Sequence, residues 1–123
     1  REVAKCMLGR KAGTIIFTGA TASIRGSDGF SAFAGAKHAK RSLAQSMARE
    51  LGPQGIHVAH VVIDGAIDTP WIKELFNDFY NEKKDLDGLM NPNDIANNYL
   101  WLSKQPRNAW THEIDLRPWI EKW

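Results

Sequence analysis

The chain has 123 residues, of which 43% are hydrophobic and 24% charged, and acidic and basic residues are mixed along it to give a net charge of +2. This pattern excludes the basic stripe of a nucleic-acid-binding protein, and the longest apolar runs are far shorter than the roughly 20 residues that cross a bilayer. A single cysteine, Cys6, excludes an internal disulfide and multi-cysteine metal motifs, so we expect one cytoplasmic domain without nucleic-acid, membrane or metal partners.

The first eight residues have the pattern of the last two turns of a helix that ends near Gly9, but no N-cap or other start signal precedes them. We therefore expect the sequence to be a fragment of a longer chain. Residues 14–18 form a short β-branched run that is apolar on both faces, which predicts a buried strand. A loop rich in Gly, Ser and Thr, residues 19–29, leads away from the end of this strand.

The stretch Ser31–Leu51 has the pattern of one amphipathic helix, and the rest of the chain is arranged around it. Phe33 and Lys37 are four residues apart and share a face of this helix. Its many alanines and one glycine would allow another backbone to approach closely. The helix is predicted to end at Gly52, as a left-handed cap before a proline. An apolar i, i+4 stripe further along the helix is predicted to face the core: Leu43, Met47 and Leu51.

Residues 56–63 are predicted to form a second buried strand, so that strand, helix and strand make a βαβ unit with parallel strands. Ligands of open α/β sheets lie beyond the carboxyl ends of the strands, which places the candidate site at residues 19–31 and 64–69. His57 and His60 lie three apart on the second strand and point to opposite faces, which argues against a shared metal ion.

The remaining segments extend the α/β pattern. Thr69 and Pro70 are predicted to start another helix as N-cap and first residue, with Trp71, Leu75 and Phe79 on one side. Residues 81–91 are polar and expected to be mobile. A helix starting at Asn91 and Pro92 and an edge strand over 111–117 follow. Three residues of that helix are expected to be buried: Ile95, Tyr99 and Leu102.

Several of these segments, in this order, resemble the C-terminal half of the short-chain dehydrogenases/reductases. Residues 13–18 resemble the strand before that family's catalytic serine, and residues 33–37, from Phe33 to Lys37, occupy the place of its Tyr-x-x-x-Lys motif. Residues 64–69 resemble its Pro-Gly-x-Val-x-Thr nicotinamide loop, and residues 94–96 and 111–117 fit its last helix and strand. The resemblance implies that 1–123 form a single partial domain, half of a doubly wound parallel-sheet, Rossmann-like fold without the N-terminal strands and glycine-rich turn.

Two positions depart from the family pattern. The serine position falls on Ala20 and the tyrosine position holds Phe33, so neither has a hydroxyl group. In the family the tyrosine supplies the proton for the forming alkoxide as general acid, which phenylalanine cannot do. Thr21 or Ser23 is an alternative source of the lost hydroxyl, and Asp64 stands at the family's proline, where it either caps the chain or acts as an acid.

The resemblance also implies a cofactor, NAD or NADP, which binds only together with the missing N-terminal half. Lys37 is then expected to bind the nicotinamide ribose, and Ile67, through its backbone, and Thr69 the nicotinamide carboxamide. Two functions follow: an oxidoreductase of small molecules with a degenerate active site, or a catalytically silent scaffold. The family further implies a homo-oligomer that associates through the Ser31–Leu51 helix.

Overall fold

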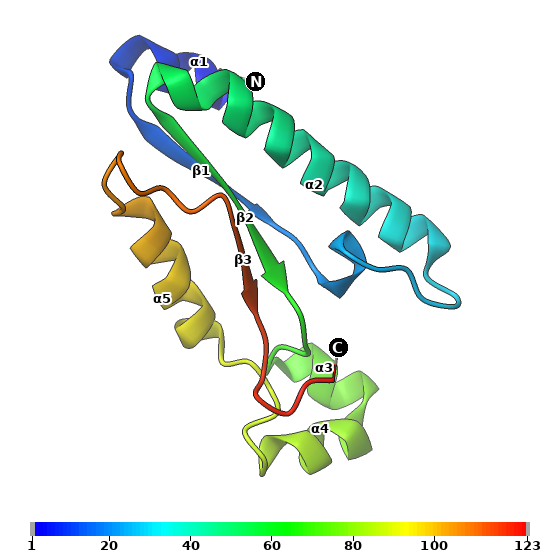
Figure 1. The fold of residues 1–123 in the computed structure, drawn as a ribbon. Coiled ribbons are helices and arrows are strands. Elements are labelled where there is room, and N and C mark those ends of the chain that lie inside the picture. Colours follow the sequence, from blue (N-terminus) through cyan, green and yellow to red (C-terminus); the bar gives the residue numbers. More distant parts are fainter. Residues whose placement is uncertain (1, 123) are drawn as a thin grey trace.

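The computed structural model describes residues 2–122, so Arg1 and Trp123 lie outside the described residues. The chain alternates helices and strands around one small sheet (Figure 1). The elements, with η for a 3-10 helix, are α1 (Glu2–Arg10), β1 (Gly13–Thr18), η1 (Thr21–Ser23), α2 (Ser31–Leu51), η2 (Gly52–Gln54), β2 (Ile56–Ile63), α3 (Pro70–Leu75), α4 (Asn77–Lys84), α5 (Pro92–Ser103) and β3 (Glu113–Leu116).

The three strands form a parallel sheet in the order β1-β2-β3, which confirms the predicted α/β class and βαβ unit. In the register, Ile16 lies beside Ala59, and His60 lies beside both Phe17 and Glu113. All eight residues of the central strand β2 are buried, as a strand covered on both faces must be. The edge strand expected over 111–117 is β3, which is shorter by three residues.

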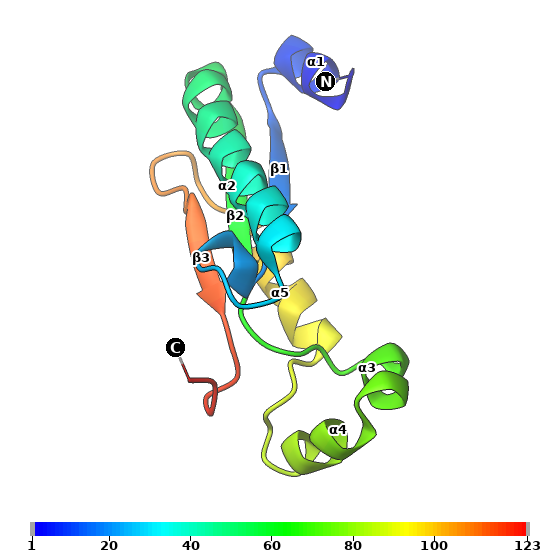
Figure 2. The same cartoon turned by 90° about the vertical axis from the view of Figure 1, so that its right-hand side faces the viewer.

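Helices cover both faces of the sheet (Figure 2). On one face, α1 and α2 pack on Ile56 and Val58 through side chains that include Met7, Met47 and Leu51. On the other face, α5 packs on β2, and this contact buries Leu102 completely. Ile95 and Tyr99, also predicted to be buried, are partly buried and pack against this second cluster.

The helix predicted over 31–51 has those bounds, but its inner face differs from the predicted stripe. Leu43 is 52% exposed, whereas Ala44, one residue on, is fully buried. Small residues face β2 because they let the helix lie close to the sheet, and this turns Leu43 outward. Gly52 keeps right-handed helical angles, and the left-handed residue is Gly55, where a Cβ would lie 2.4 Å from the Lys11 carbonyl oxygen.

The single helix predicted after Thr69 is wrong, because the chain breaks at Phe76 into α3 and α4. Trp71 and Leu75, predicted to share one side of that helix, are 62% and 57% exposed. Of the residues 81–91 that were expected to be mobile, the first four belong to α4, which ends at Lys84. Both short helices lie beyond the carboxyl end of the sheet (Figure 1).

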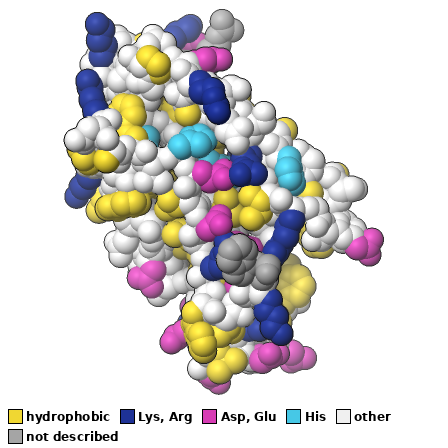
Figure 3. Space-filling view, in the orientation of Figure 1, with side chains coloured by type: hydrophobic (Ala, Val, Ile, Leu, Met, Phe, Trp, Pro, Cys, Tyr) yellow, Lys and Arg dark blue, Asp and Glu magenta, His cyan; other side chains and the backbone are white. Residues whose placement is uncertain are grey.

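Positive and negative side chains are interspersed over the face shown in Figure 3 rather than gathered into one basic stripe. Within residues 2–122 no helix is long and apolar enough to span a bilayer. The same residues contain no group of three or more His, Cys, Asp or Glu side chains placed to hold a metal ion.

Candidate functional site

The loops that follow β1 and β2 meet at the carboxyl edge of the sheet, where ligands of this architecture bind. They enclose a cavity of about 300 Å³. Ala20 and Phe33, which are far apart in the sequence, both line it. The other lining residues come from the same loops, from the N-cap of α2 and from the last residue of β2: Thr21, Ala22, Arg25, Ser27, Phe30, Ile63 and Gly65.

Phe33 forms one wall of this cavity rather than part of the core. It lies in the first turn of α2, is 47% exposed, and meets Phe30 edge to face with their ring centroids 6.4 Å apart. The carboxyl edge therefore presents aromatic carbon where the family's pattern has a phenol oxygen.

Lys37 lies one turn further along α2, and its Nζ atom is 5.3 Å from the centre of the Phe33 ring. The ammonium group thus lies beside the residue that lines the cavity. Burial and the nearby charge of Lys40 lower the pKa of Lys37. No carboxylate among residues 2–122 forms an ion pair with Lys37, so its donors are available to a ligand.

The two hydroxyls weighed as replacements for the lost serine differ in their surroundings. Ser23 is fully buried, and its Oγ accepts a hydrogen bond from the Ala20 amide at 3.0 Å, so it stabilises the turn after β1. Thr21 lines the cavity, and its Oγ1 donates to Asp64 Oδ1 at 2.5 Å. This pair joins residues 43 positions apart, and no local pattern in the sequence signals it.

The loop after β2 contains the two residues expected to bind the nicotinamide carboxamide. Thr69 caps α3, and its side-chain oxygen accepts a hydrogen bond from the Ile72 amide at 3.3 Å, as predicted from the Thr-Pro pair. Ile67 pairs with Met90 in a single bridge whose bonds use the Ala66 carbonyl and the Asp68 amide. The peptide groups of Ile67 itself are not used in that bridge.

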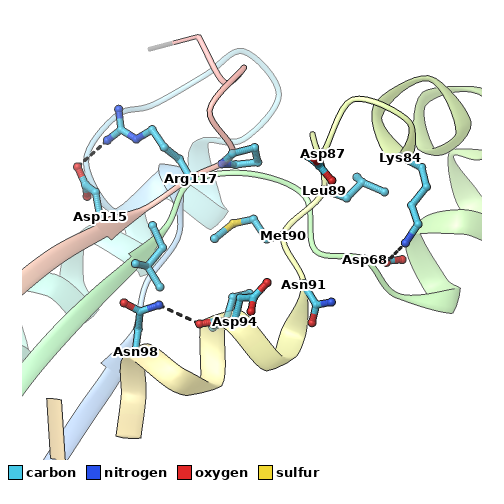
Figure 4. Close-up of a pocket in the computed structure, with 13 residues that line it drawn as sticks. Asp68, Lys84, Asp87, Leu89, Met90, Asn91, Asp94, Asn98, Asp115 and Arg117 are labelled. Atoms are coloured by element: carbon cyan, nitrogen blue, oxygen red, sulfur yellow. Dashed lines mark hydrogen bonds and ion pairs between the residues drawn. The ribbon is translucent and has the colours of Figure 1, made fainter. Parts of the chain in front are cut away.

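Asp68 connects this loop to α4, a role that the sequence analysis missed. Its carboxylate accepts hydrogen bonds from Tyr80, at 2.6 Å, and from Lys84. These bonds lower the pKa of Asp68, chiefly through Lys84, and raise the pKa of Tyr80. Asp68 and Lys84 stand at one end of a second cavity, of about 570 Å³, which is lined from α5, β3 and the 87–91 segment (Figure 4).

A network of three side chains fastens α2 to the sheet close to the site. Arg41 on α2 donates from Nε and a terminal guanidinium nitrogen to the two Glu113 carboxylate oxygens, at 2.8 and 2.6 Å. Glu113 Oε2 also lies 2.9 Å from Nδ1 of the fully buried His60. The Arg41 bonds, with His60, lower the pKa of Glu113 against the opposing effect of burial. The sequence analysis placed His60 on a face of β2 but found neither partner.

A model of the short-chain dehydrogenase family matches residues 1–79. Among solved structures, a short-chain dehydrogenase from Rhodopseudomonas palustris is 44% identical with a TM-score of 0.72, and the match covers 97% of this chain and 44% of that one. A protein of the short-chain dehydrogenase/reductase family is 29% identical with a TM-score of 0.72, over 91% of this chain and 48% of that one. No curated protein matches the sequence significantly.

The likeness in fold extends to more distant structures. A closed form of serine dehydrogenase complexed with NADP+ has a TM-score of 0.81 at 19% identity and covers all of this chain. The chain spans about half the length of the solved structures it matches, 51% in that case. These matches confirm both the Rossmann-like α/β fold and the resemblance read from the sequence: the chain belongs to the short-chain dehydrogenase/reductase family.

Proposed function

We propose that this chain forms the part of an NAD(P)-dependent oxidoreductase that faces the nicotinamide and the substrate, with a degenerate active site. The observation that carries this proposal is Lys37, whose ammonium lies 5.3 Å from the centre of the Phe33 ring, which lines a cavity at the carboxyl edge of the sheet. Ala20 and Phe33, at the family's serine and tyrosine positions, line that same cavity. This placement supports a site of the family type whose side chains lack its hydroxyl groups.

The residues present fit a nicotinamide nucleotide. Lys37 offers charged donors to a ribose hydroxyl, the Ile67 peptide groups are not used in its bridge to Met90, and Thr69 lies two residues further along the same loop. A bound nicotinamide would supply or accept the hydride. The similar serine dehydrogenase structure is a complex with NADP+, which supports this choice of cofactor class.

Replacing Lys37 by methionine is expected to weaken NADH or NADPH binding by roughly 10-fold to 100-fold, because hydrogen bonds to a charged group contribute about 1.5–3 kcal/mol. Fluorescence titration of the full-length protein with each nucleotide measures this change. The matched control is Lys40→Met, which removes a charge from an exposed position one turn further along α2. Equal affinity in both variants would contradict the role of Lys37. Absence of binding to the parent protein at millimolar nucleotide would overturn the nucleotide proposal itself.

A second candidate function is a scaffold that keeps the fold for self-association through α2. The observation that favours it is an exposed stripe on the outer side of this helix, at spacings of four, three and four residues. Its members are small or apolar and would let two helices pack closely: Ala32, Ala36, Ala39 and Leu43. A two-fold axis that passes at Leu43 would bring the two copies of this residue together.

If this stripe forms the contact, Leu43→Glu is expected to weaken the dimer about 100-fold, because like charges placed together at an interface cost several kcal/mol. Sedimentation velocity over a range of protein concentrations would then show the variant as a monomer where the parent is a dimer. Leu100→Glu is the matched control, since Leu100 is also 52% exposed but lies on α5. The same sedimentation for parent and both variants would sink the α2 interface.

A further inference from the structure

The buried carboxylate of Asp64 orients a hydroxyl group of the cavity. Asp64 directly follows β2 and is fully buried, and its Oδ1 accepts the proton of Thr21 Oγ1 at 2.5 Å. A threonine hydroxyl has one proton and two lone pairs. Because that proton is held by Asp64, Oγ1 keeps its lone pairs for a donor, and toward any further partner Thr21 acts as a hydrogen-bond acceptor.

Two arginines compensate the buried negative charge. Nitrogen atoms of Arg25 and Arg117 lie 3.7 Å from Oδ1 and Oδ2 of Asp64, respectively. A buried carboxylate is tolerated when it is paired, and here Oδ1 is also hydrogen-bonded, whereas Oδ2 has no hydrogen-bond partner among residues 2–122. In this contact the Thr21 hydroxyl is the donor and Asp64 Oδ1 the acceptor, which sets the direction of the Thr21 hydrogen bond.

The surroundings of Thr21 turn this orientation into a preference among ligands. The cavity wall is mostly apolar, formed by alanines, Ile63 and the Phe30 and Phe33 rings, and its volume of about 300 Å³ suits a small molecule. We infer that Thr21 Oγ1, oriented by Asp64, accepts a hydrogen bond from the hydroxyl group of a small alcohol, so that the cavity selects an alcohol over the matching carbonyl compound. The inference rests on the proposed function in that it takes this cavity as the substrate site.

A purely structural role makes a different prediction. If Thr21 and Asp64 only hold the turn after β1 against β2, removal of the hydroxyl lowers the melting temperature and leaves ligand preference unchanged. The three probes are 1-phenylethanol, acetophenone and ethylbenzene, which share shape and differ in the polar group. Their dissociation constants for the full-length protein are measured by NMR titration in the absence of nucleotide.

For the parent protein, 1-phenylethanol is expected to bind about threefold to tenfold more tightly than either other probe, the range for one hydrogen bond. Thr21→Val removes the hydroxyl group and is expected to abolish this preference. Thr21→Ser keeps the hydroxyl group and is expected to keep the preference. Ser27→Ala, which removes the other hydroxyl of the cavity wall, is the control and is expected to keep it. Tighter binding of acetophenone, or an unchanged preference in Thr21→Val, would overturn the inference.

A second measurement does not depend on the folding of any variant. In the parent protein, an intermolecular NOE is expected between the methyl group of 1-phenylethanol and the γ-methyl of Thr21, and its absence also overturns the inference. Nucleotide titration of the same samples separates the two proposals. If the protein prefers the alcohol but binds no nucleotide, the proposed cofactor is overturned and the role of Thr21 stands. If it binds nucleotide but does not prefer the alcohol, the role of Thr21 is overturned and the proposed cofactor stands.

Discussion

Replacing Glu113 by alanine is expected to lower the free energy of unfolding by about 2 kcal/mol, between the cost of losing an exposed ion pair and that of breaking a buried one, because this pair is partly buried. The reason is that one carboxylate serves two elements at once. It accepts two hydrogen bonds from Arg41 on α2, and it is the partner of Nδ1 of His60 on β2. Its removal leaves a guanidinium that is 33% exposed, and a fully buried imidazole, without their acceptor.

Asp115→Ala is the matched control on the same strand. Asp115 forms an ion pair with Arg117, two residues further along the chain, and the Asp115 side chain is 41% exposed. Loss of this ion pair is therefore expected to lower the free energy of unfolding by less than about 1 kcal/mol. Urea denaturation followed by circular dichroism measures both variants. A loss from Glu113→Ala no larger than that from Asp115→Ala would show that the network is not a main attachment of α2.

The same carboxylate makes stability depend on pH in a definite direction. The pKa of Glu113 in the folded chain lies below its ordinary value of 4.5, chiefly because Arg41 donates to the ionised form. A lowered carboxylate pKa contributes stability that is fully present above the unfolded value and is lost as pH falls through the folded one. Stability of the parent is therefore expected to fall more steeply below about pH 4.5 than that of Glu113→Gln.

The elements that local patterns specify strongly were predicted well. The bounds of α2 and β2 matched, because an amphipathic helix, and an eight-residue run between glycine and a polar loop in which only His57 and His60 are polar, leave few alternatives. Leu43 was placed wrongly because several small residues allowed α2 to turn its alanines to the sheet. The helix after Thr69 was also wrong, since the bonds of Asp68 to Tyr80 and Lys84 draw α4 back toward the loop after β2.

The candidate site was predicted only where local sequence patterns determine it. Spacing along one helix placed Phe33 beside Lys37, and strand order brought the loops after β1 and β2 together. Bonds between residues distant in sequence could not be read from spacing. Thr21 with Asp64 and Arg41 with Glu113 are separated by 43 and 72 positions, and each pair is selected by the packing of the finished fold.

The largest gain in activity is expected from restoring both missing hydroxyls in the double variant Ala20→Ser, Phe33→Tyr. Both positions line the cavity, and Phe33 is 47% exposed, so a phenol oxygen and a serine oxygen enter open space rather than the packed core. The Ala20 backbone is already held by the bond from its amide to Ser23 Oγ. The added groups therefore need little rearrangement of the fold.

General acid catalysis by a positioned side chain contributes about 100-fold to 10,000-fold, so the double variant is expected to reduce a panel of small ketones at least 100-fold faster than the parent. NADH and NADPH oxidation by the full-length protein measures the rate. Adding Lys37→Met to the double variant is expected to remove most of the gain, since the ammonium lies 5.3 Å from the ring that would carry the new oxygen. If the double variant is folded and binds nucleotide but gains no rate, the site does not hold a ketone within reach of these hydroxyls, and the scaffold function becomes the better account.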